Sequence, residues 1–129
     1  MGVVFDQDSG NILISFRPPG KVMAGYWEFP GGKLEAGENC FQALARELHE
    51  ELGIIVDERE MELIGKVEHL YPHGLAQLDL IIIKRYNGEA RGLEGQQVCW
   101  CQPLITAAPT PLLPTATRVF EILQSYLGS

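Results

Sequence analysis

The sequence predicts a single domain of the α+β class spanning residues 1–129, in which short strands surround two or three helices. A length of 129 residues suits one domain with a substantial core. Two segments, 40–52 and 110–127, repeat apolar residues at helical spacing, and several short apolar runs lie between turn residues. No internal repeat or linker divides the chain.

The N-terminal segment predicts two short strands, at 3–5 and 12–16, joined by a turn. Asp8, Ser9, Gly10 and Asn11 are the residue types that turns use. The next stretch, RPPGKVMAGYWEFPGG at 17–32, is rich in Gly and Pro and predicts a loop.

A helix is predicted from Cys40 to Leu52. Asn39 is a good N-cap, Gln42 three residues later completes a capping box, and Gly53 ends the helix. The core face is expected to comprise the apolar residues at helical spacing, which are Phe41, Leu44, Ala45, Leu48 and Leu52.

The second half of the chain predicts further strands at 62–72, 75–86 and 97–103. The pair Asn87-Gly88 is a strong hairpin signal and predicts a turn between the second of these strands and residues 89–92. The last helix is expected to bury the stripe Val119, Ile122, Leu123, Tyr126 and Leu127.

Composition restricts the function. The net charge of −7 argues against binding to nucleic-acid backbones, and an anionic substrate would require bridging cations. No run is long enough to span a membrane and the N-terminus lacks a signal-peptide pattern, so we expect a cytoplasmic protein. Cys40, Cys99 and Cys101 predict neither a disulfide framework nor a zinc site, and we interpret them as small apolar side chains or surface thiols.

The helix at 40–52 carries an unusual acidic edge. Successive helical residues turn by about 100°, which places Glu47, Glu50 and Glu51 along one edge beside the core face. Arg46 is the one cation in the helix interior, and the same rotation directs it away from this edge. A solvated acidic surface is one interpretation. A site for Mg²⁺ or Mn²⁺ is the other, because clustered carboxylates without His or Cys suit hard cations.

The same residues form a recognisable motif. The Nudix pattern G-x5-E-x7-R-E-U-x-E-E-x-G-U, where U is a bulky apolar residue, is filled over residues 32–54 by Gly32, Glu38, Arg46, Glu47, Leu48, Glu50, Glu51, Gly53 and Ile54. The chain therefore resembles the Nudix hydrolases. Similarity to the MutT-type branch extends over nearly the whole chain, including EGQQVCW and PLLPTATRVFEIL.

This resemblance implies a fold, a reaction and a metal. The fold would be an α/β/α sandwich with a mixed sheet between helices, and the box would form a loop–helix–loop. The reaction would be Mg²⁺-dependent hydrolysis of a nucleoside triphosphate to a monophosphate and diphosphate, with Mn²⁺ as a substitute. The MutT-type branch includes 8-oxo-dGTP diphosphatases and pyrimidine triphosphate pyrophosphohydrolases.

The resemblance also implies roles for individual residues. The implied metal ligands are the Gly31 carbonyl and the carboxylates of Glu47, Glu50, Glu51 and Glu94. Glu94 would bind metal or take the proton of the attacking water, and Glu38 would support the ligands. Arg46 would orient the cluster by pairing with a box carboxylate, so that the expected catalytic set is Arg46, Glu50, Glu51 and Glu94. Lys33 and Arg17 are the nearest cations for phosphate or base.

The residues that read the base are less clear. The MutT-type branch often has an Asn after the Pro of the C-terminal segment, whereas this chain has Ala116 in that region, which weakens the case for 8-oxoguanine. Asp79 interrupts an apolar strand and is either a solvated surface residue or an acceptor in the base pocket. Phe29, Leu80 and Trp27 are candidates for the pocket wall.

Three functions remain open from the sequence. The first is a pyrophosphohydrolase for 8-oxo-dGTP, and the second is the same chemistry on CTP or a modified dCTP. The third is a non-catalytic nucleotide-sensing domain, which would not need the complete carboxylate set. The expected partner is a small nucleoside triphosphate rather than a nucleic acid or a membrane, and the protein would be a monomer or a homodimer.

Overall fold

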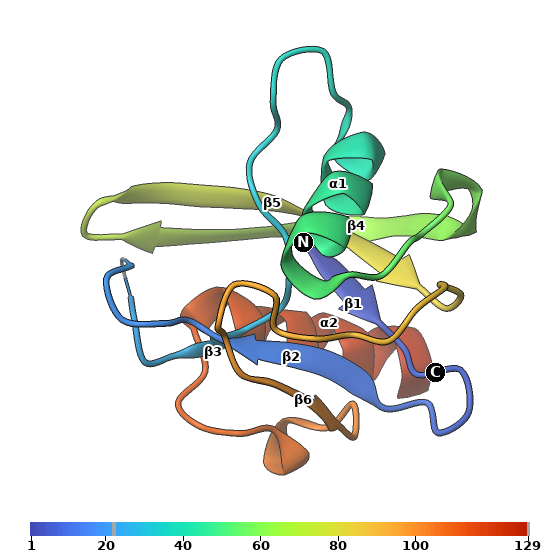
Figure 1. Cartoon of the computed structure of the whole chain (residues 1–129). Coiled ribbons are helices and arrows are strands. Elements are labelled where there is room, and N and C mark those ends of the chain that lie inside the picture. The colour runs from blue at the N-terminus through green and yellow to red at the C-terminus, as the bar shows by residue number, and fades with distance from the viewer. Residues whose placement is uncertain (22, 129) are drawn as a thin grey trace.

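The computed structural model describes residues 1–21 and 23–128, in which three strands precede the first α-helix and three more precede the second (Figure 1). The strands are β1 (Gly2–Val4), β2 (Ile12–Phe16), β3 (Trp27–Glu28), β4 (Met61–Tyr71), β5 (Gly74–Ile83) and β6 (Val98–Cys101). The helices are α1 (Cys40–Leu52) and α2 (Pro114–Gly128), with 3₁₀ turns η1 (Glu58–Glu60) and η2 (Ile105–Ala107). The expected α+β class is confirmed.

The strands form two three-stranded sheets where we expected one mixed sheet. The first has the order β1-β5-β4 and is mixed, because β1 is parallel to β5 and β4 is antiparallel to it. The second has the order β3-β2-β6 and is antiparallel. A single bridge between Phe5 and Ile12 connects the two sheets near the turn at 6–11.

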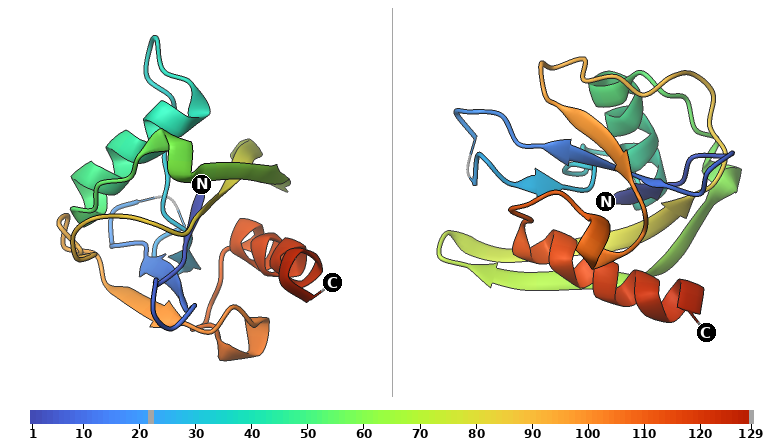
Figure 2. Two further views of the ribbon diagram at one scale, coloured as in Figure 1. Left: turned by 90° about the vertical axis from the view of Figure 1, so that its right-hand side faces the viewer. Right: turned by 90° about the horizontal axis from the view of Figure 1, so that it is seen from below.

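The strands separate two helices, as an α/β/α sandwich requires (Figure 2). Successive side chains of a strand point to opposite faces, so β1, β2 and β5 each contribute to two cores. The core on the α2 side contains Val3, Ile12, Ile14, Leu80 and Ile82. The core on the α1 side contains Val4, Leu13, Ile81 and Ile83.

Helix α1 has the boundaries that the sequence predicted. The Asn39 side chain accepts a hydrogen bond from the Gln42 backbone N–H at 2.8 Å, and the Gln42 side chain accepts one from the Asn39 N–H at 2.9 Å. Gly53 adopts φ 74° and its N–H bonds the His49 carbonyl, which ends the helix. These local signals fix both ends of α1, and therefore the positions of Glu47, Glu50 and Glu51 within the helix.

Three predictions about local structure were wrong. The segment at 17–32 contains a short strand, β3, because Trp27 and Glu28 pair antiparallel with Phe16 and Ser15 of β2. Asn87-Gly88 does not close a hairpin with residues 89–92. Asn87 instead exchanges two backbone hydrogen bonds with Ile55, a long-range contact that the local turn signal cannot reveal.

The third error concerns α2. Its buried face consists of Thr115, Ala116, Val119, Phe120 and Leu123, whereas Leu127, which we expected inside, is 44% exposed. Phe120 is buried because its ring packs against Phe29, with ring centroids 5.4 Å apart. Within the described part of the chain, neither helix is long and apolar enough to cross a membrane.

Candidate active site

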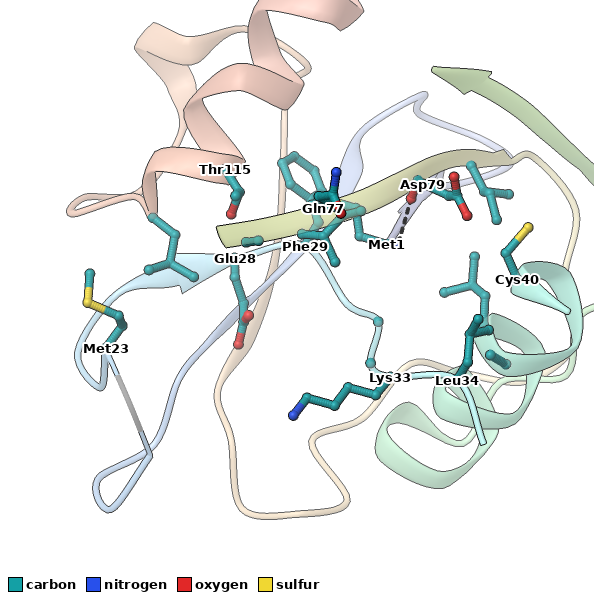
Figure 3. Close-up of a pocket in the computed structure, with 18 of the residues that line it drawn as sticks. Met1, Met23, Glu28, Phe29, Lys33, Leu34, Cys40, Gln77, Asp79 and Thr115 are labelled. Atoms are coloured by element: carbon teal, nitrogen blue, oxygen red, sulfur yellow. Dashed lines mark hydrogen bonds between the residues drawn. The ribbon is translucent and has the colours of Figure 1, made fainter. Parts of the chain in front are cut away.

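A cavity of about 530 Å³ opens where the two sheets diverge (Figure 3). Its walls are formed by β3 and the loop that follows it, by the start of α1, by β5 residues between 76 and 81, and by the start of α2. The side chains that face it include Arg17, Glu28, Phe29, Lys33, Cys40, Gln77, Asp79 and Thr115. One end of the cavity borders Gly31 and Gly32, and therefore the acidic edge of α1.

Arg46 organises this acidic edge. Its guanidinium donates to Glu38 at 2.7 Å, to Glu47 at 2.8 Å and to Glu50 at 3.3 Å. These bonds raise the pKa of Arg46 and lower that of Glu38. The pairing that the resemblance implied is present, but the helical-wheel direction assigned to Arg46 was wrong, because a long side chain reaches across more than one residue position.

Glu51 differs from the other box glutamates. Its pKa is raised to about 8, first by burial, then by a hydrogen bond to Glu47, and then by the charges of Glu47 and Glu94. A carboxyl group with this pKa holds a proton at neutral pH when no metal is bound. Glu47, Glu51 and Glu94 thus form a cluster whose negative charge is not fully compensated.

The Gly31-Gly32 pair allows the backbone to approach this cluster. A Cβ at Gly32 would lie 2.5 Å from Glu47 Cδ and 2.6 Å from one of its carboxylate oxygens. Gly31 has φ 147°, and a Cβ there would lie 2.8 Å from the Cα of Met1. Glycine at position 32 therefore leaves room for the carboxylate of Glu47 beside the loop backbone, and glycine at position 31 leaves room for Met1.

The donors of this cluster fit a hard divalent cation, because they are carboxylate oxygens whose mutual repulsion such an ion would relieve. The side chains of the expected ligands nevertheless do not all converge on one point. Among residues 1–21 and 23–128, no three His, Cys, Asp or Glu side chains converge closely enough to hold a metal ion. Arg46 holds Glu50, whose side chain is 54% exposed, and Glu94 lies exposed on the loop before β6.

Two cations border the cavity. Arg17 Nη1 donates to both carboxylate oxygens of Glu28, at 2.9 and 3.2 Å, which makes a half-buried ion pair on one wall. Burial raises the pKa of Glu28, and Arg17 opposes this rise. Lys33 extends its side chain along the cavity (Figure 3). The sequence reasoning did not select Glu28, although it stands directly before Phe-Pro-Gly-Gly.

The expected base pocket is only partly assembled from the expected residues. Phe29 and Asp79 face the cavity, where the Asp79 side chain is 33% exposed and lies 3.9 Å from Lys66, and the role of Asp79 in base recognition stays a prediction. Leu80 is fully buried in the core on the α2 side, because it points to the opposite face of β5 from Asp79. Trp27 packs edge-on against Phe16 rather than on the cavity wall.

Ala116 also lies outside the pocket, since it is 1% exposed in the α2 core. Its neighbour Thr115 faces the cavity instead and exchanges long hydrogen bonds, of 3.4 Å each, with the Tyr71 hydroxyl. Gln77 and Tyr71 were missed because their convergence with Thr115 depends on where β5 and α2 pack, which no local pattern records.

The cysteines are free thiols, as expected. Cys99 and Cys101 pack against the core on the α2 side, where burial raises the pKa of each thiol. Cys40 borders the cavity, and burial together with Asp79 raises its pKa.

Known proteins share this arrangement. The family model for the NUDIX domain matches residues 1–120 of the chain. An 8-oxo-dGTP diphosphatase of Proteus vulgaris is 39% identical over 94 residues, which cover 73% of this chain and 81% of that protein. A CTP pyrophosphohydrolase of Escherichia coli is 34% identical over 127 residues, covering 94% of this chain and 87% of that one.

Solved structures agree with these sequences. A MutT protein from a study of Aliivibrio salmonicida and Vibrio cholerae has 35% identity and a TM-score of 0.71, and the match covers 93% of each chain. A MutT NUDIX hydrolase from Burkholderia pseudomallei has 25% identity and a TM-score of 0.82, with 95% of each chain covered. The similarity thus includes both the box and the strands that form the cavity.

Proposed function

The chain belongs to the NUDIX domain family, and from that premise we propose that it is a divalent-metal-dependent nucleoside triphosphate pyrophosphohydrolase. The reaction is NTP and water to NMP and diphosphate. The observation that carries this proposal is the carboxylate cluster of Glu47, Glu51 and Glu94 beside Gly31-Gly32, at one end of a cavity wide enough for a nucleoside.

Divalent ions are the general cofactors of Nudix hydrolases, and Mg²⁺ suits this all-oxygen site best, with Mn²⁺ as a substitute. The Glu47, Glu50 and Glu51 carboxylates and the Gly31 carbonyl would hold it. When bound, such an ion neutralises charge on phosphate oxygens and lowers the pKa of water. Glu50 must leave part of its contact with Arg46 to take part, which its exposure allows.

The side chains supply positioning and proton transfer. Arg46, anchored by Glu38, orients Glu47 through their 2.8 Å contact. Lys33 attracts the phosphate chain to the end of the cavity that borders the cluster. The water that attacks the anhydride between the α- and β-phosphates loses its proton to Glu94, which lies on an exposed loop within the electrostatic reach of Glu51.

Two classes of nucleobase are candidates for binding in the cavity. Relatives named as 8-oxo-dGTP diphosphatases favour an oxidised purine. The CTP pyrophosphohydrolase relative favours a pyrimidine, and it matches the chain over 94% of its length, including the C-terminal segment where Ala116 stands in place of the expected Asn. Asp79, Gln77 and Thr115 provide polar groups for either base, and a cytoplasmic nucleotide pool is the expected setting.

The proposal is tested by measuring diphosphate release with Mg²⁺ from 8-oxo-dGTP, dGTP, CTP, 5-methyl-dCTP and ADP-ribose, compared by kcat/KM. We expect turnover of 8-oxo-dGTP or of the cytidine nucleotides. Nucleotide binding without turnover of any compound, at neutral and at alkaline pH, would contradict the enzyme and favour the sensing domain.

The variant Glu51→Gln tests whether Glu51 belongs to the metal site. It keeps the shape of the side chain, removes its charge, and should lower kcat by about two orders of magnitude or more while the fold persists. Glu58→Gln is the matched control, because Glu58 is exposed on η1 and outside the cluster. A Glu51→Gln variant within a few-fold of the wild type would remove this glutamate from the metal site.

A further inference from the structure

Strand β4 forms one edge of the mixed sheet. In the described chain, its hydrogen-bonded neighbour is β5, and the sheet order β1-β5-β4 leaves its other side without a strand. Seven residues, 65–71, continue beyond the bulge between Leu63 and Gly65. A regular edge of this length is a template for another strand unless the protein blocks it.

The groups on this free edge follow from the sheet register. Asp79 and Ile81 bond the backbone of Met1, so the odd-numbered residues of β5 point toward β1 and the even-numbered ones toward β4. Val67 lies opposite Leu78 and therefore bonds β5. The backbone N–H and C=O groups of the alternate residues Lys66, Glu68 and Leu70 consequently point outward.

The side chains along this edge carry both signs of charge. A shallow groove between β4 and α2 is lined by Lys66, Val67, Glu68, Arg118, Glu121 and Ile122, which include two cations and two anions in a chain of net charge −7. The Lys66 side chain is 76% exposed, and its 3.9 Å contact with Asp79 leaves its ammonium accessible. Leu70, on the same face, is 73% exposed.

We propose that this edge binds a second copy of the chain, with β4 antiparallel to its counterpart about a two-fold axis at Val67. This register places Lys66 of each copy opposite Glu68 of the other, and their outward backbone groups form hydrogen-bonded pairs. A two-fold interface must be complementary to itself, and an edge with Lys and Glu at equal distances on either side of Val67 meets that condition.

Helix α2 supports the same symmetry. It runs antiparallel to β4, since Thr115 bonds Tyr71 at one end and Tyr126 bonds Glu62 at the other. The outer flank of α2 beside Val67 carries Arg118 and Glu121. The two-fold axis brings the flank of one copy beside that of the other, and each flank carries one charge of each sign. A peptide or nucleic acid of one dominant charge would meet repulsion from half of this groove.

The test is the molar mass of the full chain by sedimentation equilibrium over about a hundredfold range of concentration. The proposed interface is smaller than a standard protein–protein interface, which buries about 1,600 Å² of surface, so we expect a dimer that dissociates on dilution. Lys66→Glu or Glu68→Lys alone places like charges opposite each other twice and should weaken dimerisation by about tenfold or more. The double swap, Lys66→Glu with Glu68→Lys, should restore it.

Glu58→Lys is the matched control, because it makes the same change of charge as Glu68→Lys at an exposed site on η1, outside the segment 65–71 that forms the proposed interface. Circular dichroism and thermal unfolding of every variant would establish that the fold persists. A wild type that stays monomeric over the whole range would overturn the proposal. So would single variants that dimerise like the wild type, or a double swap that stays as weak as the single variants.

Discussion

The close approach of Gly32 to Glu47 yields a sharp prediction for Gly32→Ala. The new Cβ would lie 2.5–2.8 Å from the three terminal atoms of the Glu47 side chain. Because the backbone at Gly32 is not in the left-handed region, alanine fits the local conformation. The substitution therefore acts on the carboxylate rather than on the loop.

The size of the effect follows from these distances. An ordinary carbon contact begins near 3.4 Å, so the carboxylate must move by about 0.9 Å, away from its 2.8 Å contact with Arg46. A displacement of about 1 Å in a positioned group can lower a rate by about a hundredfold. The fold should change little, because only the end of a flexible side chain has to move. Alanine also reduces the conformational freedom of the unfolded chain, which stabilises the folded protein by about 0.4–1 kcal/mol.

The assay is steady-state diphosphate release with Mg²⁺, together with thermal unfolding of the same preparations. Gly65→Ala is the control, since Gly65 also lacks a left-handed φ and a Cβ there would meet no atom within 4 Å. We expect kcat of Gly32→Ala to fall by about a hundredfold at nearly unchanged stability. A variant within about threefold of the wild type would refute the placement of Glu47 in the metal site.

Three further predictions concern the same cavity. First, Glu51 has a folded pKa near 8 against 4.5 unfolded, so its contribution to the stability of the metal-free protein is complete below 4.5 and is lost as pH rises through 8. Thermal unfolding in EDTA should show this fall and Glu51→Gln should abolish it, whereas metal affinity should rise up to about pH 8. A flat profile for the wild type would contradict the raised pKa of Glu51. Second, Arg46→Lys cannot make the same set of contacts and should weaken metal binding by about tenfold, as measured by calorimetry, and an unchanged affinity would show that Arg46 does not orient the ligands. Third, Asp79→Asn should change the ranking of nucleobases by kcat/KM, and an unchanged ranking would exclude Asp79 from base recognition.

Local signals in the sequence were reliable wherever neighbouring residues decide the structure. Asn39, Gln42 and Gly53 fixed both ends of α1, because caps act within one helical turn. The failure at Asn87-Gly88 has the opposite cause. Asn and Gly are common turn residues, but the partner that completes the backbone hydrogen bonds of Asn87 is Ile55, more than thirty positions away in the chain.

The acidic edge shows the same division at the site. Helical spacing predicted that Glu47 and Glu51 lie together, and the resemblance implied that Arg46 supports them. The reach of the Arg46 side chain to Glu38, and the burial that raises the pKa of Glu51, depend on how the loop at 31–38 folds over the helix. Spacing alone therefore misdirected Arg46, whose Nη1 contacts both Glu47 and Glu50.

By itself, the sequence determined the family, the helix that carries the glutamates and the glycines that let the backbone approach them. These features depend on contacts between residues close in the chain, and on a motif read residue by residue. Only the tertiary structure decided which side chains line the cavity. It placed Thr115, rather than Ala116, and Asp79, rather than Leu80, on the wall. Neighbouring residues of a strand point to opposite faces, and the face that meets the substrate is set by packing between distant elements.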